Sequence, residues 1–122
     1  MLSRKVALPT VILAAMLASS NARGSGGYYS GHNLVEGMNE QEKPAADRSR
    51  DCVKAAEFAG FVEGVHDALD RYTFCSPPNG ALGEVLAVVR SYVKANPEEW
   101  HRPAGVLVER ALKQAFPCKP LK

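Results

Sequence analysis

Three cysteines, Cys52, Cys75 and Cys118, are the residues of this chain best suited to covalent chemistry. A cysteine nucleophile needs a histidine within hydrogen-bond reach and a third group that orients the histidine. The chain has no C-x-x-C and no C-x-x-C-H motif, which excludes the redox and haem-attachment motifs. Cys75 follows a predicted helix and Cys118 closes the last one, which favours a disulfide between these two in an oxidising compartment. The sequence therefore predicts one disulfide and a spare thiol, Cys52, rather than a nucleophile.

An acidic cluster with one histidine is the other candidate for chemistry. His66 and Asp70 are four residues apart, so on a helix they share a face, as metal ligands on a helix do. Glu63 and Asp67 lie beside them, but a metal needs a third ligand, and neither H-x-x-x-H nor H-E-x-x-H occurs. We interpret the cluster as a solvated acidic face and predict no metal. Phosphate-loop, dinucleotide and G-x-S-x-G motifs are absent as well, so the sequence predicts no cofactor and no enzyme.

The helices that must position these residues are indicated by the spacing of apolar side chains. Between Val53 and Tyr72 such side chains recur at intervals of three and four, which is the pattern of a helix with one buried face. The same pattern predicts main helices over residues 51–72, 82–95 and 103–116, and a short helix over 32–40. No segment alternates with period two. The sequence thus predicts an all-α fold, a small bundle of three main helices plus short helices, stapled by a disulfide.

Two glycines lie inside the first long predicted helix, where glycine is unfavourable. Gly60 and Gly64 each cost up to about 1 kcal/mol relative to alanine in a helix interior. The benefit that would offset this cost is close approach by a neighbouring helix. That helix belongs either to the same bundle or to a second copy across a two-fold axis.

The first residues have the layout of an export signal. Arg4 and Lys5 precede an uncharged, mostly apolar run of 12 residues, Val6–Leu17, and Ser20-Asn21-Ala22 offers a small-x-small cleavage site. The run is shorter than the roughly 20 residues that span a bilayer, so we predict cleavage near Ala22 and no membrane anchor. The chain divides into a signal peptide over 1–22, a flexible lead-in over 23–31 and one helical domain over 32–122.

The charge of the chain argues against two classes of partner. There are 15 basic and 13 acidic residues, and two of the basic ones, Arg4 and Lys5, lie in the signal peptide. The mature part is therefore balanced in charge. Such a domain has no electrostatic footprint for nucleic acid or for an anionic membrane, and we predict neither as a partner.

Several stretches of the sequence, taken together, resemble one family. These are Gly60–Ala68, Phe74–Pro77, Tyr92–Glu98, His101–Ala104 and Ala115–Cys118. Their order and spacing over about residues 32–118 are similar to the Rap1a/Tai family of periplasmic immunity proteins. The resemblance implies an exported, all-helical domain, often a homodimer, that binds and blocks a peptidoglycan amidase delivered by the type VI secretion system of a neighbouring cell. It also implies a periplasmic location and a disulfide between Cys75 and Cys118.

The chain departs from the family pattern at a second disulfide. Family members usually have one cysteine near the end of the first short helix and another just before the glycine motif. This chain has Met38 and Phe58 at those places. Because both partners are replaced by apolar residues, no thiol is stranded, and a Met–Phe contact is expected to substitute partly for the staple. The alternative function is that of a periplasmic structural or stress-related protein of the same fold without a toxin partner.

An inhibitor that enters an enzyme cleft needs a protruding and preorganised segment, because rigidity lowers the entropy cost of binding. Two segments qualify, one containing two prolines and one braced by Pro97. Their candidate partner-binding residues are Ser76, Pro77, Pro78 and Asn79 in the first, and Glu98, Glu99, Trp100, His101 and Arg102 in the second. Trp and Arg are common in interface hot spots, which supports the second segment. The alternative for Trp100 is that it caps the bundle core.

Overall fold

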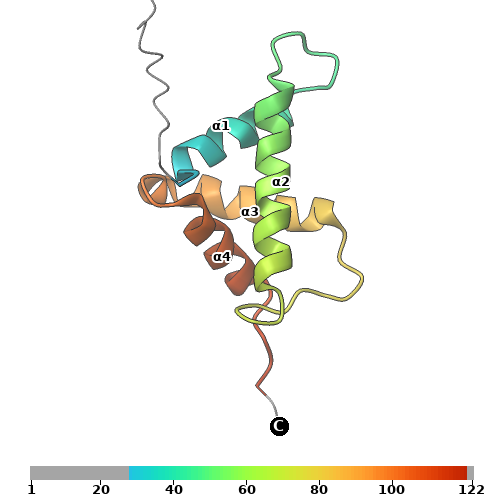
Figure 1. Cartoon of the computed structure of the whole chain (residues 1–122), viewed down its shortest axis with the longest axis vertical. Helices are drawn as coiled ribbons and strands as arrows, with labels where there is room; N and C mark the ends of the chain where they lie inside the picture. Colours follow the sequence, from blue (N-terminus) through green and yellow to red (C-terminus); the bar gives the residue numbers. More distant parts are fainter. Residues whose placement is uncertain (1–27, 121–122) are drawn as a thin grey trace, which may run out of the picture.

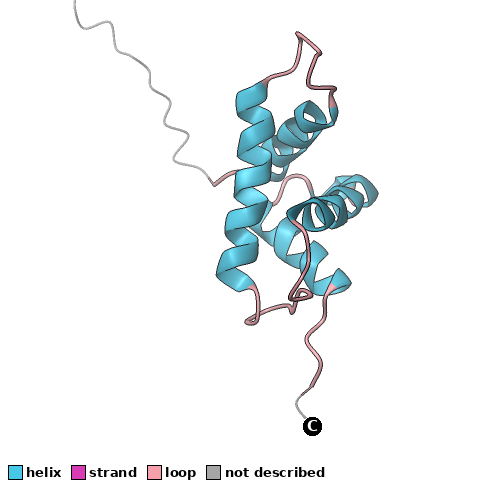
Figure 2. Cartoon of the chain, turned by 90° about the vertical axis from the view of Figure 1, so that its right-hand side faces the viewer, coloured by secondary structure: helices cyan, strands magenta, loops and turns pink. Residues whose placement is uncertain are grey.

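The structure is a computed structural model that describes residues 28–120. Over that range the chain forms helices and no strand, in the order α1 (Gly31–Glu42), α2 (Cys52–Leu69), α3 (Leu82–Ala95), η1 (Pro97–Glu99) and α4 (Ala104–Ala115). The helix α2 runs along the molecule (Figure 1), and the other helices lie on one side of it (Figure 2). Most contacts join α1 to α2 and α3 to α4. The prediction of an all-α bundle is confirmed.

The first described residues contact the start of α4. The predicted signal peptide and residues 23–27 lie outside the described range, but Tyr29 and Ser30 are held by the start of α4. The Ala104 N–H donates a hydrogen bond to the Tyr29 carbonyl at 2.7 Å, and the Tyr29 ring lies 4.8 Å from that of Phe61. The helix α1 begins at Gly31, the last residue of the lead-in that the sequence predicted. Within residues 28–120, no helix combines the length and the apolar character needed to cross a membrane.

The first two helices begin at side-chain caps. Ser30 and Asn33 form a capping box, in which the Ser30 hydroxyl accepts from the Asn33 N–H and the Asn33 side chain accepts from the Ser30 N–H. This box fixes the start of α1, which is 12 residues long and extends beyond the predicted range of 32–40 at both ends. Asp51 accepts hydrogen bonds from the Val53 and Lys54 N–H groups at 3.0 Å each, and so begins α2.

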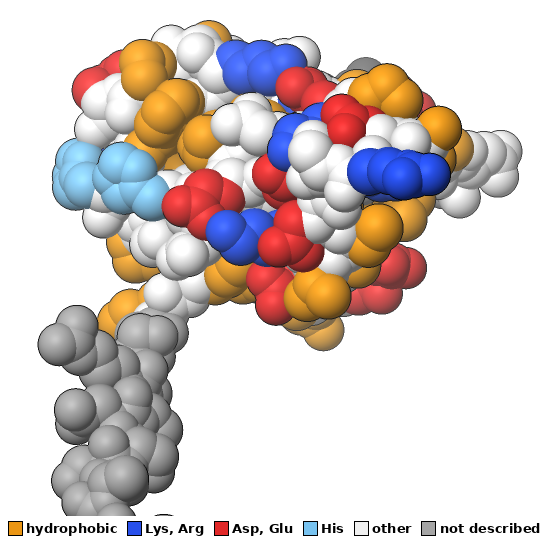
Figure 3. Space-filling view, turned by 90° about the horizontal axis from the view of Figure 1, so that it is seen from above, with side chains coloured by type: hydrophobic (Ala, Val, Ile, Leu, Met, Phe, Trp, Pro, Cys, Tyr) orange, Lys and Arg blue, Asp and Glu red, His pale blue; other side chains and the backbone are white. Residues whose placement is uncertain are grey.

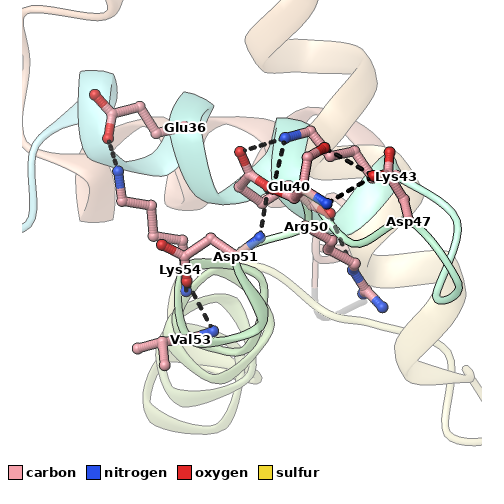
Figure 4. A network of polar contacts seen from close by, with 9 residues as sticks. Glu36, Glu40, Lys43, Asp47, Arg50, Asp51, Val53 and Lys54 are labelled. Atoms are coloured by element: carbon pink, nitrogen blue, oxygen red, sulfur yellow. Dashed lines mark hydrogen bonds and ion pairs between the residues drawn. The ribbon is translucent and has the colours of Figure 1, made fainter.

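A polar corner connects the end of α1 to the start of α2 (Figure 4). The Glu40 carboxylate accepts from the Lys43 ammonium at 2.8 Å and from the Asp51 N–H at 2.8 Å. Its backbone carbonyl accepts from the Arg50 Nε at 3.1 Å. Because α1 has no basic residue in its last turn, Arg50 supplies the positive charge that a helix C-terminus favours.

One hydrophobic core fills the space between the helices. Its buried side chains come from all four α-helices and from the segment between α2 and α3: Leu34, Val35, Met38, Phe58, Val62, Phe74, Val85, Leu86, Val89, Val93, Ala104, Leu107, Val108, Ala111 and Leu112. Met38 and Phe58, the residues at the family's second cysteine pair, are 1% and 0% exposed. Both therefore contribute to the packing of α1 on α2.

Two residues of the predicted α2 stripe are exposed instead. Val53 is 67% exposed and Tyr72 is 85% exposed. Val53 lies nine residues before the buried Val62, which at 100° per residue places it on the opposite face of the helix. Tyr72 follows the end of α2 at Leu69 and lies in the turn that comes after it. The buried face is thus narrower than the apolar spacing indicated.

Close helix packing occurs at a different glycine from the two that the sequence suggested. A Cβ at Gly37 in α1 would lie 2.7 Å from the Lys54 carbonyl and 2.8 Å from the Phe58 Cβ, so α1 crosses α2 there. A Cβ at Gly60 or Gly64 would meet nothing within 4 Å. Of the two alternatives for these glycines, the structure does not show close packing by a helix of the same bundle within residues 28–120, and packing by a second copy stays a prediction. The two glycines line an open apolar hollow of about 500 Å³ on the surface of α2.

The predicted disulfide between Cys75 and Cys118 is present. The two Cα atoms lie 4.8 Å apart, and the Cys75 N–H also donates to the Phe116 carbonyl at 2.8 Å. The disulfide joins the segment after α2 to the end of α4, across a sequence separation of 43 residues. Cys52 is a free and exposed thiol at the start of α2.

Candidate functional site

The first candidate segment is anchored at Ser76, which is only 5% exposed. Its N–H donates to the Asp70 carboxylate at 2.9 Å, and its carbonyl accepts from the Arg71 guanidinium at 3.0 Å. Its hydroxyl shares a hydrogen bond of 2.9 Å with the His66 Nε2. All three polar groups of Ser76 are therefore satisfied by residues at the end of α2. Ser76 holds the segment in place and is not itself available to a partner.

The side chain of Asp70 is ionised in this arrangement. Burial alone would raise the pKa of Asp70, but hydrogen bonds from the Ser76 N–H and hydroxyl, and the nearby charges of Arg71 and His66, lower it below its ordinary value. The cluster that sequence analysis weighed as a metal site therefore includes a carboxylate already used by a backbone amide. Within residues 28–120, no three His, Cys, Asp or Glu side chains converge in a way that could hold a metal ion.

The four residues after Ser76 form the exposed part of the segment. Pro77, Pro78, Asn79 and Gly80 are all exposed, and a hydrogen bond of 3.0 Å from the Gly80 N–H to the Pro77 carbonyl closes them into a turn. We name residues 77–80 the contact loop. Figure 1 shows that the chain between α2 and α3 projects away from the helices. The contact loop carries no charged side chain. Burying it in a cleft would therefore incur no desolvation cost for a charged group.

The second candidate segment is bound more closely to the bundle. Trp100 donates from its Nε1 to the Val93 carbonyl at 2.9 Å and packs against the core, as expected of a residue that caps it. Glu99 is paired with Arg110 at 2.7 Å and accepts from the Tyr92 hydroxyl at 3.2 Å. A Cβ at Gly31 would lie 2.5 Å from the Trp100 carbonyl, so α1 also confines this segment.

Three residues of the second segment remain exposed, namely Glu98, His101 and Arg102. The structure does not bring them together with the contact loop. The loop precedes α3 and the second segment follows it, so the 14 residues of α3, about 21 Å, separate them. The two segments that the sequence predicted therefore lie at opposite ends of α3.

The charge on the surface is mixed. On the face that Figure 3 shows, acidic and basic side chains lie next to one another, with apolar side chains between them. This matches the balanced charge of residues 23–122, which contain 13 basic and 13 acidic residues.

Sequence reasoning missed the roles of Asp70, Arg71 and Ser76. Asp70 was assigned to a solvated face, and Ser76 to the partner-binding surface. Arg71 has a φ of 70°, in the left-handed region that non-glycine residues rarely adopt. Because arginine has no preference for this conformation, the sequence does not predict the turn. The spacing of an Asp at a helix end and a Ser six residues later was the one available signal.

One known protein family matches the part of the chain that forms the helices and the disulfide. The sequence profile of the family described as Rap1a immunity proteins matches residues 29–118, which is the whole of the helical bundle and the disulfide. Comparison with curated proteins gives no match. Because the profile covers most of the chain, the chain belongs to the family of Rap1a immunity proteins.

Proposed function

We propose that this protein is exported to the periplasm, where it binds and inhibits a peptidoglycan amidase delivered by a type VI secretion system. The family match over residues 29–118 is the observation that carries the proposal, since members of an immunity family bind a toxin. The residues at the start of the chain support export, because they combine two positive charges, a short apolar run and a cleavage site. The disulfide supports an oxidising compartment.

The contact loop is the part of the surface that we assign to the amidase. It projects from the bundle, is closed by its own hydrogen bond and follows an anchored residue. A loop that is already in its bound shape loses little conformational entropy on binding. The second segment presents Glu98, His101 and Arg102, whereas the side chains of Glu99 and Trp100 are engaged in hydrogen bonds within the protein. It therefore fits a catalytic cleft less well.

A protection experiment tests the function. An amidase encoded beside this gene is directed to the periplasm of a host cell, with or without this protein. We expect lysis with the amidase alone and survival when the full chain is present. A chain whose residues 1–22 are deleted should fail to protect, because it stays in a different compartment. Lysis in spite of the full chain, with every neighbouring amidase, would favour the alternative of a protein without a toxin partner.

A further inference from the structure

The end of α2 holds the residue from which the contact loop departs. His66, Asp70 and Arg71 each bond to a different polar group of Ser76, at 2.9, 2.9 and 3.0 Å. We name these four residues the Ser76 clamp. Its hydrogen bonds are shielded, because Ser76 is 5% exposed. Ser76, the last residue of the clamp, directly precedes Pro77, the first residue of the contact loop.

The clamp depends on a sharp reversal of the chain after α2. Arg71 adopts a left-handed backbone conformation, with φ of 70°, and its N–H donates to the Phe74 carbonyl at 2.7 Å. Phe74 is fully buried, and its ring lies 5.7 Å from that of His66. The reversal thus brings Ser76 back to the helix that the chain has just left. A left-handed conformation is unfavourable for an arginine, so the hydrogen bonds and packing around Arg71 must stabilise it.

We propose that His66, Asp70 and Arg71 are positioning residues for toxin binding, and that the Ser76 clamp, in addition to the disulfide, sets the direction of the contact loop. The inference rests on the proposed function, because it assigns the loop to the amidase. Pro77 and Pro78 have a fixed φ and restrict the residue before each of them, so little freedom remains between Ser76 and Asn79. The orientation of Ser76 therefore determines where Asn79 points.

Amide hydrogen exchange of the full mature chain tests the clamp without any toxin. Asp70→Ala removes the acceptor of the Ser76 N–H, and we expect exchange at Ser76 and Gly80 to become at least tenfold faster, while amides in α3 keep their protection. Asp70→Asn retains an acceptor oxygen and should restore most of the protection. Asp47→Ala is the matched control, because Asp47 accepts from the Ser49 N–H in the same way, but in the loop before α2. It should leave the exchange of the contact loop unchanged.

Affinity for the amidase then tests whether the clamp matters for binding. We expect Asp70→Ala to weaken binding at least tenfold, Asp70→Asn to recover most of the loss and Asp47→Ala to bind like the natural protein. Unchanged exchange at Ser76 in Asp70→Ala would overturn the clamp, whether or not any amidase binds. Faster exchange with undiminished affinity would overturn the positioning role. If the natural protein binds no amidase, the proposed function fails and the positioning role fails with it, while the exchange data still decide whether the clamp exists.

Discussion

At the scale of single residues, several carboxylates are ionised because the fold surrounds them with donors. The Lys43 side chain and the Asp51 N–H lower the pKa of Glu40. Burial raises the pKa of Asp70, but hydrogen bonds from Ser76 and the charge of Arg71 together lower it. For Glu99, bonds from Arg110 and Tyr92 likewise outweigh burial. Each of these groups joins two parts of the chain that are separate in sequence. Their charge therefore contributes to the fold and not only to solubility.

Acid should weaken the protein for this reason. A carboxyl group whose pKa is lower in the folded state stabilises the fold above its unfolded pKa of about 4, and this contribution is lost as the pH falls through the folded value. We expect the free energy of unfolding, measured in urea, to fall steeply below about pH 4. The decrease should be smaller in Asp70→Asn. A free energy of unfolding that is constant or rises between pH 5 and pH 3 would contradict this account.

At the scale of helices, substituting alanine for glycine is expected to have opposite effects on the free energy of unfolding at two positions. Gly37 lies where α1 crosses α2, with no room for a Cβ, whereas Gly64 faces open space. We expect Gly37→Ala to lower the free energy of unfolding by about 1–3 kcal/mol through overpacking. Gly64→Ala should raise it by about 0.5–1 kcal/mol, because alanine is the better helix former. Thermal or urea unfolding of both variants is the measurement, and equal effects would show that α1 and α2 do not pack as described.

The open face of α2 also bears on assembly. Gly60 and Gly64 line an apolar hollow that no other helix of the described chain covers. We expect a second copy to cover it, so that the natural protein sediments as a dimer and Gly64→Leu sediments as a monomer. A Cβ at Gly64 would meet nothing within 4 Å in its own subunit, so any loss of stability in this variant should come from loss of the dimer and should depend on protein concentration. A natural protein that is monomeric at high concentration, or an unchanged mass in Gly64→Leu, would contradict this expectation.

The helices could be predicted from the sequence, because apolar spacing and capping residues mark them. The stripe that contains Phe58 and Val62 repeats often enough to define a buried face, and Asp51 marks the start of α2. Val53 was misassigned because apolar spacing alone does not say how wide that face is. The network around Ser76 could not be predicted, because it depends on a left-handed Arg71, and that conformation has no signature in an arginine.

At the scale of the whole molecule, one disulfide joins the segment after α2 to the end of α4. A crosslink across 43 residues stabilises a chain by about 4 kcal/mol in the chain-entropy model. A small domain has a total stability of about 5–15 kcal/mol. We therefore expect Cys75→Ser with Cys118→Ser to unfold at much lower urea concentration, and Cys52→Ser to behave like the natural protein. Equal unfolding midpoints for the two variants would show that the disulfide is not structurally important.

The central claim is that the contact loop, and not the opposite end of α3, meets the amidase. Its most direct test is the dissociation constant of the amidase complex for two exposed substitutions at those two ends. We predict that Asn79→Trp weakens binding more than tenfold, or about 1.4 kcal/mol, while Glu98→Arg changes it less than threefold. Circular dichroism should show both variants folded. If Asn79→Trp binds as tightly as the natural protein, or if Glu98→Arg causes the greater loss, the amidase does not bind at the contact loop.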